Sequence, residues 1–258
     1  MKYNEDDYLY IDGQHYDSQA RSRYTDDFRT LYKEFFMEQA KKYGTPVLEL
    51  ACGTGEVAIP IAKEGLSVVG LDFSNKMLEQ AKMKSQKSGT EIKWILGDMT
   101  NFELKEKFST IIMPGAAFNW ITSNESVEKC LSCVRKHLKR GGRFIFDAFN
   151  PDLAILQRER YDLYPIAEYP NPEGEGLVKV LGGNEYEKAT QINYFDSYYR
   201  IGTEEIVKTL KLRMFFPAEL DSLLYYNSLK IEEKYGSYNK DPFNSDSNRQ
   251  IIICQKSK

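Results

Sequence analysis

The sequence predicts an α/β protein with a doubly wound, mostly parallel sheet, and two observations support the prediction. Short apolar runs alternate with segments of helical periodicity between residues 47 and 147, which is typical of parallel strands joined by helices. Acidic or glycine-rich elements follow successive runs, at the strand ends where open α/β sheets bind ligands. A chain of 258 residues suits one such domain with an added segment.

The first part of the chain, residues 1–46, is expected to form a polar, tyrosine-rich arm followed by a helix over about 25–42. Tyr8 lies in this arm together with Tyr3 and Tyr10. An aromatic arm either covers a binding site or packs on the core, and both interpretations remain open. The βα core follows over residues 47–150.

The segment Val47-Leu-Glu-Leu-Ala-Cys-Gly-Thr-Gly-Glu-Val57 predicts a buried strand, a glycine turn and a helix that begins near Glu56. Gly53 and Gly55 let the backbone turn tightly and approach a ligand closely, because neither has a Cβ atom. The free N–H groups of the following helix would face that ligand. These features are shared by many nucleotide-binding α/β proteins.

Two details of this segment indicate the kind of ligand. Ala58 stands where a dinucleotide-binding fingerprint has its third glycine, and Glu49 lies inside the strand. A carboxylate aimed at the turn would repel a pyrophosphate, whereas it suits a cofactor with a positive ammonium group. A nicotinamide-dependent oxidoreductase is therefore the disfavoured alternative.

The motif Glu49-Leu-Ala-Cys-Gly-Thr-Gly resembles the first motif of class I S-adenosylmethionine-dependent methyltransferases. The resemblance covers about residues 14–147, with further similarity near Phe216 and Tyr235. It implies a Rossmann-like methyltransferase fold with a seven-stranded sheet, and S-adenosylmethionine as the cofactor. The cofactor-binding residues that it implies in the core are Glu49, Ala51, Gly53, Gly55, Asp72, Phe73, Met77, Asp98, Met99 and Pro114.

Acids at two later strand ends fit this resemblance. A strand over 67–71 ends in Asp72, near the position at which doubly wound folds place the acid that binds ribose hydroxyls. A strand over 92–96 runs into Gly97-Asp98-Met99, which resembles the adenine-binding element of the family. There an acid accepts the exocyclic amine and the next residue covers the ring. The alternative is that Asp72 and Asp98 only cap helices.

The arm carries a second resemblance. Tyr16-Asp-Ser-Gln-Ala-Arg-Ser-Arg23 looks like the segment of glycine N-methyltransferase and related small-molecule N-methyltransferases that folds over the cofactor. The resemblance implies that Arg23 pairs with the methionyl carboxylate, for which a guanidinium has a matching donor fork. It also implies that Tyr16 lines the site near the reacting groups. In the alternative interpretation, Arg21 and Arg23 belong to a solvated helix start.

The reacting groups are expected near the segment that follows the strand over 110–113. Some small-molecule methyltransferases carry a histidine two residues beyond a phenylalanine there, whereas this chain has Trp120 after Phe118. His15 remains a candidate base, or else an exposed loop residue. A neutral amine needs little base, so the missing histidine favours N-methylation over O-methylation. The expected acceptor lining is Tyr8, Tyr16, Phe118, Asn119 and Trp120.

The region 151–216 predicts an inserted antiparallel sheet, and residues 217–258 are expected to complete the core sheet. The inserted strands lie over 177–181, 190–199 and 206–216, separated by Gly182-Gly183 and Gly202. A helix then begins at Pro217, and strands follow over 230–235 and 250–255. Tyr194, Tyr198 and Tyr199 either roof the acceptor site or fill the core of the inserted sheet. The insertion either covers the cleft or forms a homodimer.

Composition excludes several partners. A net charge of −3 argues against general nucleic-acid binding. The basic run Arg135–Arg140, which contains His137, ends a helix over 125–138 and is interpreted as a solvated helix end. The N-terminus lacks an apolar signal core, and no run has membrane-spanning length. The expectation is a cytoplasmic protein that acts on a small molecule, with neither nucleic-acid nor membrane partners.

The cysteines fit the same expectation. Four cysteines in a chain without a secretion signal indicate a reducing compartment. Cys130 and Cys133 have CxxC spacing but lie in a helical pattern, and no second pair completes a zinc site, so no metal is expected. Besides the methyltransferase and the oxidoreductase, a non-catalytic module that keeps the cofactor pocket remains an alternative.

Overall fold

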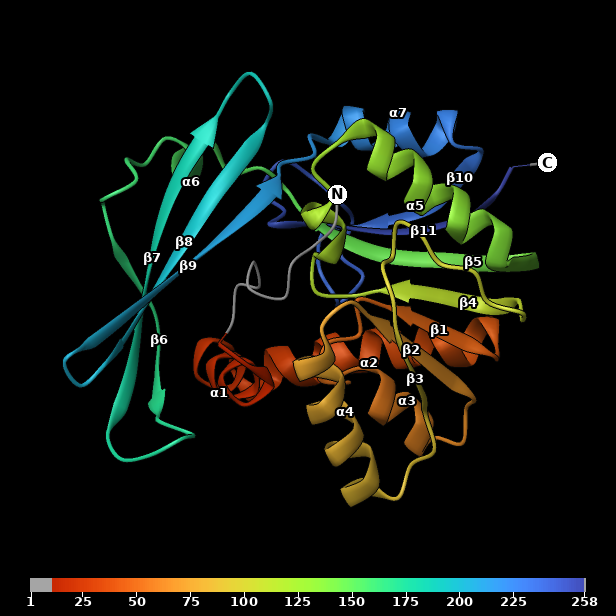
Figure 1. The fold of residues 1–258 in the computed structure, drawn as a ribbon. Coiled ribbons are helices and arrows are strands. Elements are labelled where there is room, and N and C mark those ends of the chain that lie inside the picture. Colours follow the sequence, from red (N-terminus) through yellow and green to blue (C-terminus); the bar gives the residue numbers. More distant parts are fainter. Residues whose placement is uncertain (1–10, 258) are drawn as a thin grey trace.

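The larger sheet contains seven strands, β1 (Val47–Leu50), β2 (Val68–Asp72), β3 (Lys93–Leu96), β4 (Phe108–Met113), β5 (Leu138–Phe149), β10 (Leu229–Tyr235) and β11 (Arg249–Lys256). Their order in this computed structural model, which describes residues 11–257, is β10-β11-β5-β4-β1-β2-β3 (Figure 1). Strands β1 to β5 pair in parallel, and β11 is antiparallel to β5 and β10. This arrangement confirms the predicted doubly wound sheet and its final antiparallel hairpin.

Helices cover both faces of this sheet, as Figure 1 shows. On one face, α2 (Asp26–Tyr43) and α3 (Ala58–Lys63) pack over an apolar cluster that includes Val47. On the other, α5 (Asn124–His137) and α7 (Pro217–Tyr226) pack over a cluster that includes Leu48 and Leu50. Neighbouring side chains of a strand point to opposite faces. All four residues of β1 are therefore buried, as expected for a strand covered on both sides.

Polar caps determine where several helices begin. The Thr25 hydroxyl accepts the amide of Phe28 at the start of α2, and Ser123 caps α5 in the same way. Ser74 caps α4 (Asn75–Ser88), which lies beside β2 and β3. The glycine turn continues through Val57, and the helix α3 begins at Ala58, two residues from the predicted start near Glu56.

A second sheet of four antiparallel strands follows β5, after the short α6 (Leu153–Leu156). Its order is β6 (Tyr164–Pro170), β7 (Leu177–Glu187), β8 (Ile192–Ile201), β9 (Glu204–Arg213), which confirms the inserted sheet. Two details differ from the prediction. The strand β6 was not expected, and Gly182 and Gly183 lie inside β7 rather than between strands. A Cβ atom on Gly183 would lie 2.4 Å from the carbonyl oxygen of Arg160, so this glycine allows a close backbone approach.

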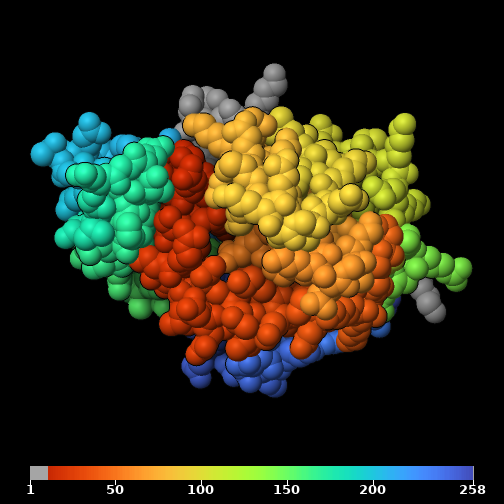
Figure 2. All heavy atoms as spheres, turned by 90° about the horizontal axis from the view of Figure 1, so that it is seen from below, coloured from red at the N-terminus to blue at the C-terminus, as the bar shows by residue number. Residues whose placement is uncertain are grey.

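The helix α1 (Gly13–Arg23) contacts both parts of the molecule. It packs against β6 of the inserted sheet on one side and against the core helix α4 on the other. Figure 2 shows it in red between the green inserted sheet and the yellow segment of the core. The Ser22 hydroxyl donates to the carbonyl of Glu168 at 2.6 Å, and the Tyr199 hydroxyl donates to Gln19 at 2.9 Å. The predicted arm is thus helical in its described part. Its last turn, not its start, carries Arg21 and Arg23.

The basic run at residues 135–140 is not a solvated helix end throughout. The helix α5 ends at His137, and Lys139 and Arg140 lie in β5. His137 is 1 % exposed, and its Nε2 accepts the backbone amide of Leu104 while Nδ1 donates to the carbonyl of Cys133. This histidine ties two elements together. Among residues 11–257, no helix combines the length and apolar character needed to cross a membrane.

Candidate active site

A cavity of about 580 Å³ opens at the carboxyl ends of the core strands, between α1, the core and the inserted sheet. Eleven of the predicted site residues line it: Tyr16, Arg23, Glu49, Ala51, Gly53, Asp72, Phe73, Asp98, Met99, Pro114 and Trp120. Gly55, Met77, Phe118 and Asn119 do not line it. Tyr8 lies outside the described residues. Cavities of this size are typical of small-molecule and cofactor sites.

The glycine turn brings backbone to the cavity wall. Ala51 and Gly53 both have positive φ angles, 54° and 52°, so the chain reverses sharply after β1. A Cβ atom on Gly53 would meet no other atom within 4 Å, so this side of the turn faces open space. At Gly55 a Cβ atom would lie 2.7 Å from the Trp94 ring. Gly55 also has a φ angle of 76°, so both packing and the backbone conformation require this glycine.

Asp72 links the end of β2 to this turn. Its Oδ2 accepts the backbone amide of Gly53 at 2.7 Å, and its Oδ1 accepts that of Ser74 at 2.9 Å. The side chain is 2 % exposed. Burial raises the pKa of the Asp72 carboxyl to about 6, although the amides of Ser74, Gly53 and Phe73 act in the opposite direction. The N-cap of α4 is Ser74, so the acid does more than begin a helix.

Glu49 lies in β1 beneath the turn and lines the cavity. It is 3 % exposed, and its Oε2 has no hydrogen-bond partner among the described residues. Burial raises the pKa of this carboxyl well above its ordinary value, opposed by a hydrogen bond from the amide of Ala58. A buried carboxylate oxygen without a donor is destabilising unless a ligand supplies one. The site therefore favours a cationic or hydrogen-bond-donating group here.

Asp98 and Met99 line the same cavity from the loop after β3. The Oδ1 atom of Asp98 accepts the amide and hydroxyl of Thr100, at 2.7 and 2.8 Å, which fixes the carboxylate at the cavity edge. Phe73 and Trp120 bring aromatic rings to the cavity, with centroids 6.3 Å apart. Carboxylates and aromatic rings thus alternate along the segments that follow β2, β3 and β4.

The helix α1 is fixed to the glycine turn by a network that sequence analysis missed. Asp17 is 8 % exposed and accepts the hydroxyl of Thr54 at 2.6 Å. The Lys84 ammonium group lies 3.0 Å from both the Asp17 carboxylate and the Thr54 hydroxyl. These contacts place Tyr16 and Arg23 along the cavity wall. These contacts could have been predicted only if the sequence of residues 13–23 had been interpreted as a helix.

The opposite wall of the cavity is apolar. Phe195, Leu210 and Leu212 line it from β8 and β9 and pack together with Leu156 and Met214. Tyr194 and Tyr198 alternate with Asn193 and Phe195 along β8 and therefore point to the other face. Tyr199 is fully buried against α1. None of these three tyrosines lines the cavity, so the roof consists of different residues from those expected.

Three other residues that were predicted to lie in the site are buried and do not reach the cavity. Phe118 is fully buried between the rings of Phe146 and Phe215. Asn119, in the 3₁₀ helix η2 (Ala117–Trp120), donates to the carbonyl of Arg213 at 2.7 Å and accepts the amide of Phe149 at 3.0 Å. It joins β5 to β9 and does not reach the cavity. Met77 is buried on the inner face of α4. The packing of these side chains corrects their predicted placement in the site.

His15 is neither a base in the cavity nor an exposed loop residue. It lies in α1, is 0 % exposed and does not line the cavity. Its Nδ1 atom is 2.9 Å from the hydroxyl of Tyr169 in β6.

One further group at the cavity wall carried no sequence signal. Tyr32, Tyr238 and Arg249 line the cavity, and the Arg249 guanidinium lies 2.6 Å from the Asp147 carboxylate. Burial raises the pKa of both the Tyr32 and the Tyr238 hydroxyl well above its ordinary value. Tyr32 lies in α2, Tyr238 lies in the loop that follows β10, and Arg249 lies in β11. Only the folded sheet brings them together.

Comparison with known proteins agrees with this geometry. Residues 47–142 match the family model "Methyltransferase domain". A glycine/sarcosine N-methyltransferase of Aphanothece halophytica is 27% identical over 166 residues, which cover 62% of this chain and 63% of that protein. A demethylmenaquinone methyltransferase of Clavibacter sepedonicus is 28% identical over 142 residues, 55% of this chain and 54% of that protein. The chain spans half or less of the length of several other curated relatives that it matches.

Solved structures extend the similarity to the whole chain. The CcbJ methyltransferase from Streptomyces caelestis superposes with a TM-score of 0.83 at 21% identity, over 99% of this chain and 100% of that one. CalS10, an amino pentose methyltransferase from Micromonospora echinaspora, superposes with a TM-score of 0.70 at 16% identity, over 94% and 96% of the two chains. The fold is thus a methyltransferase fold with an inserted sheet. The match of residues 47–142 to the methyltransferase domain model agrees with this fold.

Proposed function

We propose that the protein transfers a methyl group from S-adenosylmethionine to a nitrogen atom of a small molecule. One observation carries the proposal: a single cavity is lined by Glu49, Asp72 and Asp98 on one side and by the apolar wall of the inserted sheet on the other. The acids suit an adenosyl cofactor with an ammonium tail, and the apolar wall leaves room for a second molecule. When bound, the cofactor supplies an electrophilic methyl group on a sulfonium.

The residues fit the cofactor group by group. Asp72, fixed between Gly53 and Ser74, would accept the ribose hydroxyls. Asp98 would accept the exocyclic amine of adenine, with Met99 beside the ring. The unpartnered Oε2 atom of Glu49 would accept the ammonium group, and Arg23 would bind the carboxylate.

We assign each segment of the chain a role at this cavity. Residues 1–46 would cover the cofactor, 47–150 bind it, 151–216 form the acceptor wall, and 217–258 complete the core sheet. Methyl transfer is an in-line displacement, so these parts mainly hold the nucleophile on the axis of the breaking bond. Such positioning contributes roughly 7–11 kcal/mol. The covering helix and inserted sheet also exclude water from the reacting groups.

The ionisable groups near the acceptor favour nitrogen over oxygen. Tyr32 and Tyr238 keep their protons at neutral pH, because burial raises the pKa of each hydroxyl. Asp147 is paired with Arg249, Asp152 accepts the first amides of α6, and no histidine lines the cavity formed by the described residues. A phenol or alcohol acceptor would need a base, whereas a neutral amine would not. The similarity to a glycine/sarcosine N-methyltransferase supports the same choice.

Two measurements test the proposal. Calorimetric titration of the full chain should give binding of S-adenosylhomocysteine and none of NAD. A panel of small amines, phenols and alcohols, incubated with labelled S-adenosylmethionine, should then show label on nitrogen. Label on oxygen would make it an O-methyltransferase. Cofactor binding without transfer to any acceptor would favour the non-catalytic module, and NAD binding alone would revive the oxidoreductase.

A further inference from the structure

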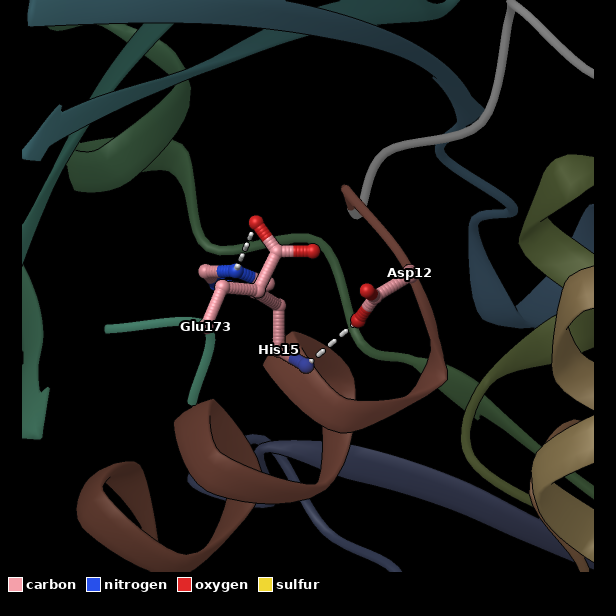
Figure 3. A group of neighbouring side chains, drawn as sticks. All are labelled: Asp12, His15 and Glu173. Carbon is pink, nitrogen blue, oxygen red and sulfur yellow. Dashed lines mark hydrogen bonds and ion pairs between the residues drawn. The ribbon is translucent and has the colours of Figure 1, made fainter. Parts of the chain in front are cut away.

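Three potential metal ligands meet outside the cavity, at the start of α1. Asp12 is the N-cap of this helix, His15 lies in its first turn, and Glu173 lies in the turn between β6 and β7. One ligand atom of each residue lies within 4.8 Å of the other two. Figure 3 shows the Glu173 carboxylate above the His15 ring, with Asp12 beside it. We propose that these side chains bind one divalent cation with the ligand preference of zinc.

Of the three side chains, the His15 ring is the one best placed to bind a cation. It is 0 % exposed, and its Nε2 atom has no hydrogen-bond partner among the described residues. Its Nδ1 atom lies 2.9 Å from the Tyr169 hydroxyl. When Nδ1–H donates to that oxygen, Nε2 carries the lone pair and faces the Glu173 carboxylate. A hydrogen bond on one ring nitrogen commonly orients the other toward a metal.

The two carboxylates complete the set without losing their other contacts. The Asp12 Oδ1 atom accepts the amides of Gln14 and His15, each at 2.8 Å, so Oδ2 remains for a cation. The Glu173 Oε2 atom lies 3.9 Å from His15 Nε2, and its side chain is 60% exposed. Its backbone amide donates to Asn171 at 3.1 Å, which holds the turn. The exposed side chain is therefore the part that can move.

Charge and geometry favour a divalent cation. The negative charge of two carboxylates beside the imidazole ring outweighs the partial positive charge of the helix N-terminus. One nitrogen and two oxygen donors, with water in the remaining position, form a set that Zn²⁺ accepts. Tetrahedral ligation at about 2.0–2.2 Å places ligand atoms roughly 3.3–3.6 Å apart. A shift of the Glu173 side chain would close the difference.

The site would join two parts of the molecule that cover the cavity. The helix α1 brings Tyr16 and Arg23 to the cavity, and the β6–β7 hairpin belongs to the sheet that forms the apolar wall. Ser22 and Gln19 already bond α1 to this sheet. A cation at Asp12, His15 and Glu173 would fix the other end of the same contact. The cation would thus stabilise the contact between α1 and the inserted sheet, which together cover the cavity.

The test is titration of the metal-free full chain with Co²⁺ and Zn²⁺, followed by calorimetry and visible absorption. We expect one cation per chain, and cobalt bands without thiolate charge transfer. His15→Gln and Glu173→Gln should each weaken binding about tenfold or more, since even outer-shell partners are worth that much. Asp12→Asn keeps an N-cap and should weaken it too. Glu175→Gln removes an exposed acid from the same turn and should leave the affinity unchanged.

Three results would overturn the proposal. One is the absence of binding, in which case a plain ion pair between protonated His15 and Glu173 explains their proximity. Another is a thiolate band, which would place the cation on a cysteine. The third is binding that survives both His15→Gln and Glu173→Gln, or that falls equally in Glu175→Gln. If His15→Gln does not fold, the exposed Glu173→Gln variant decides the question.

Discussion

The Oδ2 atom of Asp72 accepts the backbone amide of Gly53 at 2.7 Å. This hydrogen bond crosses from the end of β2 to the turn after β1, so the acid that would bind the ribose also holds the turn that would face the cofactor. A substitution at Asp72 therefore affects both contacts at once.

Asp72→Ala should weaken S-adenosylhomocysteine binding by about 1.5–3 kcal/mol, because a hydrogen bond to a charged group is lost. Calorimetry measures the change. Asp152→Asn is the matched control, because it removes a carboxylate that lines the far side of the same cavity while an N-cap for α6 is kept. Unchanged affinity in Asp72→Ala, or an equal loss in the control, would contradict the ribose contact.

The pKa of Asp72 predicts how stability depends on pH in the ligand-free protein. Burial raises it from an ordinary 3.8 to about 6, so the folded state binds more protons than the unfolded state between these values. The free energy of unfolding should then fall by about 3 kcal/mol in all as pH rises from about 3, below both values, to about 7, above both. Urea unfolding at several pH values measures it. Asp72→Asn should lack this part of the slope, and an identical slope in the variant would refute the assignment.

Local sequence patterns predicted the core strands and the side of the cavity that Glu49, Gly53 and Asp72 line. Glu49, Gly53 and Asp72 lie in or beside β1 and β2, where residues close in sequence are also close in space. The parallel register that brings Asp72 to Gly53 follows from the pairing of two adjacent strands. A motif can therefore place these residues without knowledge of the rest of the fold.

The opposite side of the cavity could not be predicted in the same way. Asn119 was expected in the cavity, yet its direction depends on contacts with β5 and β9, far away in sequence. Arg249 reaches the cavity only because β11 pairs with β5. The strand β6 contains two prolines, which usually argue against a strand and are tolerated here at the edge of the sheet. Long-range pairing thus decided what local patterns could not.

Arg23→Ala should raise the dissociation constant of S-adenosylhomocysteine without changing the melting temperature of the ligand-free protein. Arg23 is exposed in the last turn of α1 but lines the cavity, so its guanidinium can bind a carboxylate there. Arg21→Ala is the control, because Arg21 is exposed in the same turn and does not line the cavity. A loss of stability with unchanged affinity would mean that Arg23 is structural.

Asn119→Ala should lower the free energy of unfolding by about 2–4 kcal/mol, because it leaves the carbonyl of Arg213 and the amide of Phe149 without their partner. Urea denaturation measures this loss. Asn124→Ala, at an exposed position of α5, should change stability little. A variant of normal stability that has lost methyl transfer would instead support the catalytic role expected from the sequence.

Leu212→Asn should raise the KM for the acceptor while leaving the affinity for S-adenosylhomocysteine unchanged. Leu212 lies on the cavity side of β9, away from the strand ends that hold the acids. A polar side chain there would disturb the apolar wall but not the cofactor contacts. Val207→Asn is the control, because Val207 lies on β9 with 48% of its surface exposed and outside the cavity lining. If both variants altered the acceptor KM equally, or if Leu212→Asn mainly weakened cofactor binding, the inserted sheet would not form the acceptor wall.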